Sequence, residues 1–119
     1  MRLMWLLVSL FLTLLMAYLN SVALTHFLYW KYEWYDIMMH FLGGLSIASL
    51  VGALVPAHRL KLFMAFSLLA FVLWEVFELF NGVAREQNYI ADTVLDVIMD
   101  SVGAVVVYLG LINTLWRSK

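Results

Sequence analysis

The sequence predicts an all-α integral membrane protein: a single domain of four transmembrane helices in an antiparallel bundle. Of its 119 residues, 66% are hydrophobic, against about 45–50% in soluble domains. Charged residues make up only 13%, against about 25% in soluble domains. The single proline in the chain favours long, unbroken helices.

Charge and cysteine content exclude several other classes of protein. The net charge is −1 and no basic patch stands out, which excludes nucleic acid as a partner. The chain contains no cysteine, which excludes a disulfide framework, a thiolate metal site and a cysteine nucleophile. We therefore expect membrane lipids as partners, and the sequence leaves a homo-oligomer open.

The first two predicted helices cover about residues 3–27 and 35–55. No residue that is charged at neutral pH lies between Arg2 and Lys31, and a membrane span needs about 20 apolar residues. Pro56 marks the end of the second helix. The small residues at 21–23 are also typical of a signal-peptide cleavage site, but this apolar stretch is longer than a usual signal core and favours a retained span.

The last two predicted helices cover about residues 60–80 and 92–116. The dipeptide Asn81-Gly82 is a typical helix stop signal. Asp92 is a favourable N-cap residue for the fourth helix. The predicted loops at about 28–34, 56–59 and 81–91 are short, as expected for helices that neighbour each other in space.

The basic residues predict the orientation in the membrane. With four spans, both chain ends and the turn at 56–59 share one side. That side holds five of the seven basic residues, namely Arg2, Arg59, Lys61, Arg117 and Lys119. Only Lys31 and Arg85 fall on the other side. The excess of positive charge predicts a protein of the cytoplasmic (inner) membrane with both termini in the cytoplasm.

Three of the predicted helices carry acidic or histidine residues three or four positions apart, which places each set on one helical face. The sets are Asp36 with His40, Glu75 with Glu78, and Asp92 with Asp96 and Asp100. All lie in the non-cytoplasmic half of the bilayer, at depths up to about 12 Å. A charge at the bilayer centre costs about 2.5–3.5 kcal/mol. We therefore expect these groups to face inward and to line one cavity.

Clustered carboxylates need compensating charge, and a divalent metal ion supplies it most economically. Carboxylates with one histidine suit Mg²⁺, Mn²⁺, Zn²⁺, Fe²⁺ or Ca²⁺, whose identity stays open. The predicted ligands are Asp36, His40, Glu75, Glu78, Asp96 and Asp100. The alternatives are a hydrogen-bonded polar network for the deeper groups and, for Asp36, Glu78 and Asp92, a simple helix cap or interfacial position.

Small residues predict where the polar helices meet. Gly44, Ala48 and Gly52 continue the line of Asp36 and His40 at intervals of four. A matching line on the fourth helix ends in Gly103 and Ala104. Because small residues let helices approach closely in lipid, we expect the second and fourth helices to pack along these lines.

The motifs of residues 35–104 resemble those of the VanZ-like group of small membrane proteins, and most closely its YjdF type. The similarity lies in an Asp-x-x-x-His, a Trp-Glu-x-x-Glu and three aspartates before a glycine, in that order. The matching residues are Asp36, His40, Glu75, Arg85, Asp92, Asp96 and Gly103. Glu78 and Asp100 depart from the VanZ pattern. The resemblance implies a multi-pass membrane protein, linked in the VanZ case to glycopeptide resistance, and implies no agreed reaction.

Three functions fit these residues. The first is a metal-dependent enzyme acting on a lipid or lipid-linked phosphate, with His40 or Glu75 as general acid or base and Arg85 holding the phosphate. The second is an ion- or proton-coupled transporter or a lipid-handling protein. The third is a structural or accessory membrane protein whose polar network holds its helices together. The sequence alone does not decide whether the protein is an enzyme.

Overall fold

The computed structural model describes residues 1–80 and 89–117, in which the regular secondary structure is entirely α-helical. Four helices are long and apolar enough to cross a membrane. They are α1 (Arg2–His26), α3 (Glu33–Leu54), α4 (Leu60–Phe80) and α5 (Tyr89–Asn113), and a short α2 (Leu28–Lys31) follows α1. The all-helical class and the four long apolar helices are therefore confirmed.

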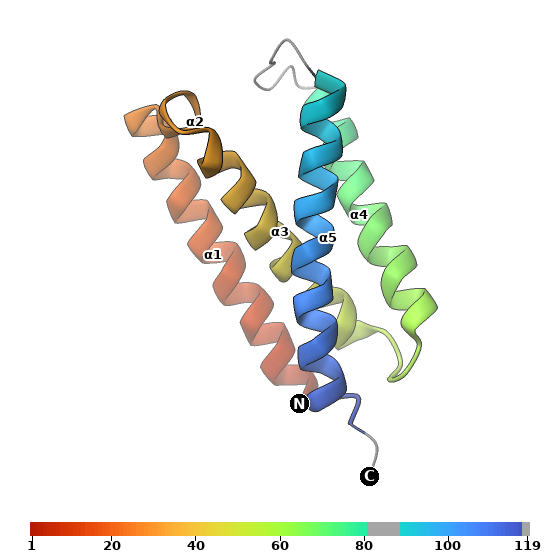
Figure 1. The fold of residues 1–119 in the computed structure, drawn as a ribbon. Helices are drawn as coiled ribbons and strands as arrows, with labels where there is room; N and C mark the ends of the chain where they lie inside the picture. Colours follow the sequence, from red (N-terminus) through yellow and green to blue (C-terminus); the bar gives the residue numbers. More distant parts are fainter. Residues whose placement is uncertain (81–88, 118–119) are drawn as a thin grey trace.

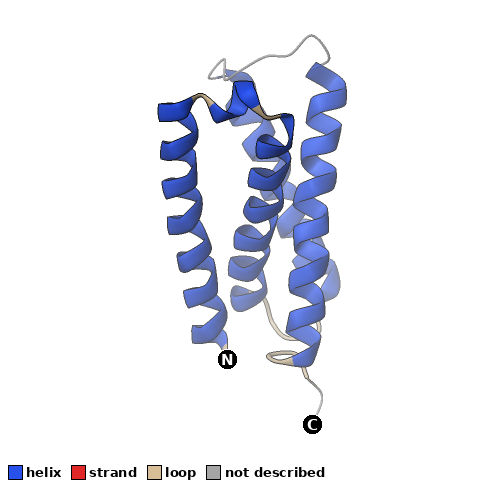
Figure 2. Cartoon of the chain, turned by 60° about the vertical axis from the view of Figure 1, so that its left-hand side comes forward, coloured by secondary structure: helices blue, strands red, loops and turns tan. Residues whose placement is uncertain are grey.

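Helix α3 is the central element of the structure. It makes its most extensive contacts with α5 and α1, and it also contacts α4. Figures 1 and 2 show the four long helices side by side, with both chain ends at the same end of the molecule. Every long helix thus reaches the opposite end, where the acidic residues lie.

Glycines allow the close contact between α3 and α5. A Cβ atom added to Gly44 would collide with the backbone of Asp100. A Cβ on Gly103 would lie 2.6 Å from the carbonyl oxygen of Phe41 and 2.7 Å from the amide nitrogen of Leu45. The predicted packing along the small residues is confirmed, and it brings the polar faces of the two helices together.

An apolar core fills the half of the structure nearest the termini. Its buried members are Ala48, Val55, Phe63, Val107, Leu111 and Trp116. At the same end, Arg2 donates hydrogen bonds from Nη1 to the carbonyl oxygens of Ala53 and Val55, the latter at 3.0 Å. The first residues of α1 therefore satisfy carbonyl groups at the end of α3 that have no partner within their own helix.

Two hydroxyl groups attach the middle of α1 to α3. The buried Ser9 donates from Oγ to the carbonyl oxygen of Ser46 at 2.9 Å. The hydroxyl groups of Thr13 and Ser46 lie 2.8 Å apart. Because these hydroxyl groups find partners across the interface, α1 packs as an integral part of the fold.

The connection between α1 and α3 differs from the predicted loop, because α2 occupies part of it. Phe27 ends α1 in the left-handed region, with φ of 57°. Tyr29 then donates a hydrogen bond to Asn20 Oδ1 at 2.9 Å, and Tyr35 donates one to the carbonyl oxygen of Leu19 at 2.7 Å. These bonds hold the start of α3, and with it Asp36, against α1.

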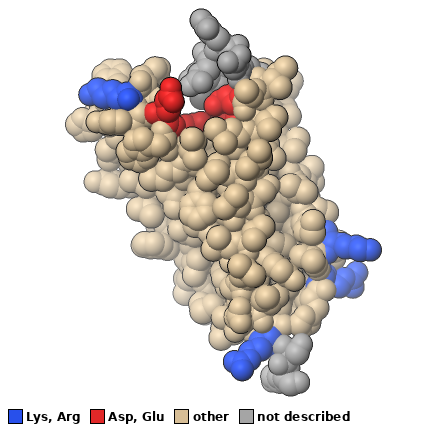
Figure 3. Space-filling view, viewed as in Figure 1, with Lys and Arg blue, Asp and Glu red and all other residues tan. Residues whose placement is uncertain are grey.

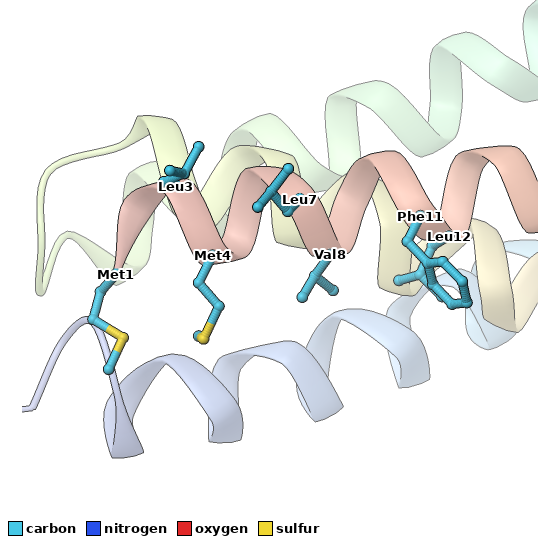
Figure 4. A pocket seen from close by; sticks show the side chains of 7 residues that line it. All are labelled: Met1, Leu3, Met4, Leu7, Val8, Phe11 and Leu12. Atoms are coloured by element: carbon cyan, nitrogen blue, oxygen red, sulfur yellow. The ribbon is translucent and has the colours of Figure 1, made fainter.

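The outer face of α1 is apolar and shallowly hollowed. Figure 4 shows the side chains that line this hollow, from Met1 to Leu12, and all seven are apolar. A surface of this kind suits contact with lipid chains. It lies at the end of α1 where the chain begins, away from the polar groups at the other end of the helices.

Candidate functional site

His40 lies at the centre of the polar groups. Its side chain is 7% exposed, and the imidazole sits between two aspartates of α5. Nε2 is 3.3 Å from Asp96 Oδ2, and Nδ1 is 3.3 Å from Asp100 Oδ1. Asp96 and Asp100 are one helical turn apart, so the spacing on α5 matches the two nitrogens of one ring.

Asp36 forms the outer edge of this cluster. Its Oδ1 lies 3.7 Å from His40 Nε2, one turn away on α3, and its side chain is 39% exposed. In Figure 3 the acidic side chains gather around a recess at the end of the molecule away from both termini. The site is therefore reached from this end, and Asp36 is at its entrance.

Helix α4 adds two glutamates. His40, Glu75, Glu78 and Asp96 each offer an atom suited to metal ligation, and these four atoms lie within 4.8 Å of one another. Glu78 also accepts a hydrogen bond from Trp74 Nε1 at 2.8 Å. Three helices thus contribute ligand atoms to one set of residues, His40, Glu75, Glu78 and Asp96, hereafter the inner group.

A second group of ligand atoms lies closer to the entrance. Asp36, Asp92 and Asp96 each offer a carboxylate oxygen, again within 4.8 Å of one another. Asp92 was expected to cap its helix or to sit at the interface. Helix α5 instead begins at Tyr89, so Asp92 lies within its first turn and joins this outer group.

Two carboxylate oxygens in the inner group have no hydrogen-bond partner among the described residues. They are Glu75 Oε1 and Asp96 Oδ1. Glu75 is 7% exposed and Asp96 is 2% exposed, so neither oxygen is hydrated by bulk water. A buried polar atom without a partner costs about 1–3 kcal/mol. Bound cations would satisfy these oxygens.

Asp100 plays a different part from the other acids. Its carboxylate faces His40 Nδ1, and it belongs to neither group of ligand atoms. A proton on Nδ1 that is donated to Asp100 leaves the lone pair of Nε2 directed at the inner group. Carboxylates often orient a metal-binding histidine in this way. Asp100, predicted as a ligand, thus sits where it would fix the ring of His40.

The structure brings together all six residues predicted as ligands, and it adds Asp92. The sequence feature that indicated Asp92 as a site residue was its spacing of four residues from Asp96. Asp92 was instead interpreted as a helix cap, so it was not included among the predicted ligands. Arg85, predicted to hold a phosphate, lies outside the described residues. The distances around His40 bring the six groups near one another, and the shared cavity in the non-cytoplasmic half stays a prediction.

An apolar crevice between α4 and α5 leads to the same site. It has a volume of about 230 Å³ and is lined by Val72, Glu75, Val76, Leu79, Thr93 and Val97. Besides Glu75 Oε1, the hydroxyl of Thr93 is buried here without a partner among the described residues. The crevice thus has apolar walls and two polar groups with unused hydrogen-bonding capacity.

Comparison with family models, curated proteins and solved structures finds no match to this chain. The resemblance to VanZ-like proteins stays a prediction from the three sequence motifs. The functional argument therefore rests on the geometry around His40.

Proposed function

We propose that the protein is an enzyme of the cytoplasmic membrane that binds a divalent cation and acts on a lipid or lipid-linked phosphate. The observation that carries the proposal is the pair of buried carboxylate oxygens near His40 that have no hydrogen-bond partner among the described residues. One nitrogen and three carboxylate oxygens within 4.8 Å of one another have the donor chemistry for Mg²⁺, Mn²⁺, Zn²⁺, Fe²⁺ or Ca²⁺.

In this proposal the four long helices cross the membrane as an antiparallel bundle. The described basic residues at the end with both termini, Arg2, Arg59, Lys61 and Arg117, favour the cytoplasm for that end. The His40 site then lies in the non-cytoplasmic half of the bilayer, with Asp36 toward the aqueous phase. A cation would enter from water, past the recess seen in Figure 3.

The crevice between α4 and α5 supports a lipid as the substrate. Its walls are apolar, and Val72, Val76 and Leu79 are each more than 40% exposed on the outer face of α4. A lipid could therefore reach Glu75 sideways from the bilayer while its polar group meets the cation. Thr93 offers a hydroxyl group for a hydrogen bond to that polar group.

Hydrolysis of a phosphate ester fits these groups. The cation, when bound, polarises a phosphoryl oxygen and activates water. The oxygen of the water forms a bond to phosphorus, and the bond from phosphorus to the departing oxygen breaks. Glu75 takes the proton of the water and then donates it to the departing oxygen. Arg85 is the proposed partner of the phosphate charge.

The apolar core favours an enzyme over the transporter considered above. Phe63, Leu111 and Trp116 are each at most 2% exposed and fill the half of the structure below the site. A transported ion would need a second conformation in which this core opens. A purely structural network is disfavoured because, within residues 1–80 and 89–117, it leaves Glu75 Oε1 and Asp96 Oδ1 without partners.

The test uses the full chain purified in detergent. Metal content is measured after purification without chelator, and phosphate release is measured from phosphatidic acid and from a long-chain prenyl diphosphate. We expect bound metal, phosphate release that chelator abolishes, and loss of release in Glu75→Gln. Glu33→Gln is the matched control, because Glu33 is an exposed acid in the first turn of α3. Protein that binds no added Mg²⁺, Mn²⁺ or Zn²⁺ would refute the proposal.

A further inference from the structure

We infer that the site holds two divalent cations bridged by the carboxylate of Asp96. This inference rests on the proposed cation site and specifies its composition. The inner group consists of His40, Glu75, Glu78 and Asp96, and the outer group of Asp36, Asp92 and Asp96. Asp96 is the residue that the two groups share.

The two oxygens of Asp96 have different surroundings. Oδ2 lies 3.3 Å from His40 Nε2. Oδ1 is buried without a hydrogen-bond partner among the described residues. A carboxylate that bridges two cations uses one oxygen for each, so a bridging role accounts for both oxygens. With a single cation on Oδ2, the oxygen Oδ1 would stay buried and unsatisfied.

Charge also favours two cations over one. The combined groups contain five carboxylates, namely Asp36, Glu75, Glu78, Asp92 and Asp96. Like charges within a few ångströms repel strongly, and two divalent cations offset more of this repulsion than one does. Asp100 is accounted for separately, through its contact with His40 Nδ1.

The two positions differ in their chemistry. The inner group includes an imidazole nitrogen and is buried at His40, Glu75 and Asp96, which suits Zn²⁺, Fe²⁺ or Mn²⁺. The outer group offers only carboxylates and includes the 39%-exposed Asp36. Oxygen ligands with room for water suit Mg²⁺, Mn²⁺ or Ca²⁺. We therefore expect the inner cation to bind more tightly and to exchange more slowly.

A pair of cations also specifies the substrate. Cations about 3.5–4 Å apart stabilise both the attacking and the departing oxygen when a phosphoryl group is displaced in line. The substrate class is thus a phosphate ester or diphosphate carried by a lipid.

The experiment counts metal ions in the full-length protein. Protein stripped with chelator is loaded with Mn²⁺ and analysed by native mass spectrometry and electron paramagnetic resonance. We expect two Mn²⁺ per chain and the spectrum of a magnetically coupled pair. Asp92→Asn and Asp36→Asn should each retain one Mn²⁺, with an uncoupled spectrum. Glu33→Gln should retain two coupled ions.

Other outcomes separate this inference from the proposed function. One uncoupled Mn²⁺ in the unaltered protein overturns the bridged pair and leaves a single-cation enzyme. Two uncoupled ions also overturn the bridge by Asp96. Binding of no Mn²⁺ overturns both proposals. Because Asp96→Asn could impair folding, the decisive variants are the two at the entrance, Asp36→Asn and Asp92→Asn.

Discussion

Replacing Gly44 by alanine would place a methyl group against the backbone of Asp100, across the contact between α3 and α5. The added Cβ would lie 2.8 Å from Asp100 Cα, whereas ordinary contact begins at 3.4 Å. The carbonyl oxygen of Asp100 would lie closer still, so the two helices must separate by more than this difference of 0.6 Å. Backbone atoms cannot rotate out of the way, as the end of a flexible side chain can.

The neighbouring Gly43 supplies a matched control. A Cβ at Gly43 would meet Met16 Cε at 3.4 Å and Asp100 Oδ1 at 3.8 Å, both ordinary contacts. Each change from glycine to alanine favours the helix by about 1 kcal/mol, and this gain cancels between the two variants. Overpacking costs about 1–3 kcal/mol. Gly44→Ala should therefore be less stable than Gly43→Ala by about 1–3 kcal/mol.

The same separation would disturb the site. His40 lies one turn from Gly44, and its 3.3 Å contacts with Asp96 and Asp100 cross the same interface. Unfolding in mixed micelles, followed by circular dichroism, measures the stability difference, and Mn²⁺ titration measures the effect on the site. Equal stability and equal Mn²⁺ affinity in the two variants would show that α3 and α5 do not pack in this way.

Four further outcomes follow from other parts of the structure. Arg2→Ala should lower the free energy of unfolding by about 1 kcal/mol, because the carbonyl groups at the end of α3 lose a charged donor; Lys61→Ala, an exposed control, should leave it unchanged in the same chemical denaturation. Metal affinity should fall as the pH is lowered, because protons compete for the carboxylates and for the imidazole; Zn²⁺ titrations at pH 8 and pH 5 that give equal affinity would contradict this. Burial, and next the charge of Asp36, raise the pKa of the Tyr29 phenol from 10.0 to about 12. The folded protein thus holds this proton more tightly than the unfolded chain does, so its stabilising contribution is complete below pH 10 and is lost as the pH rises toward 12; Tyr29→Phe should show a smaller alkaline loss of stability by circular dichroism. Finally, an impermeant thiol reagent applied to intact cells should label Glu33→Cys and spare Ala57→Cys, and the reverse result would invert the proposed orientation.

The helix boundaries were predictable where charge or a breaker marks them. Residues 60–80 were predicted as a helix and form α4, because Arg59 precedes them and Asn81-Gly82 follows. The first helix was predicted to end at about residue 27, and α1 ends at His26 with Phe27 as its C-cap, whereas α2 was not predicted. The short α2 after Phe27 depends on hydrogen bonds that Tyr29 and Tyr35 make to α1, and no local pattern encodes them.

The membership of the site was more predictable than its internal arrangement. Spacing by three and four residues placed each acid on a helical face, and the small residues paired α3 with α5. Neither signal fixes how far each helix rotates about its own axis. That rotation sets Asp100 against His40 Nδ1 rather than in a ligand group, and it brings Asp92 into the outer group. Asp92 was predicted to be a capping residue from its residue type alone.

The apolar core below His40 closes the site toward the end with both termini. The membrane potential therefore affects the binding of a cation there. In the proposed transmembrane arrangement, Asp96 lies seven residues into α5, or about 10 Å at about 1.5 Å per residue, which is about a third of a hydrocarbon layer of about 30 Å. Moving one charge across the whole layer is worth about 2.3 kcal/mol per 100 mV. A divalent cation that enters from outside to this depth would gain about 1.5 kcal/mol per 100 mV of inside-negative potential, or about tenfold in affinity. Occupancy of the site would then follow the membrane voltage as well as the cation concentration of a single compartment.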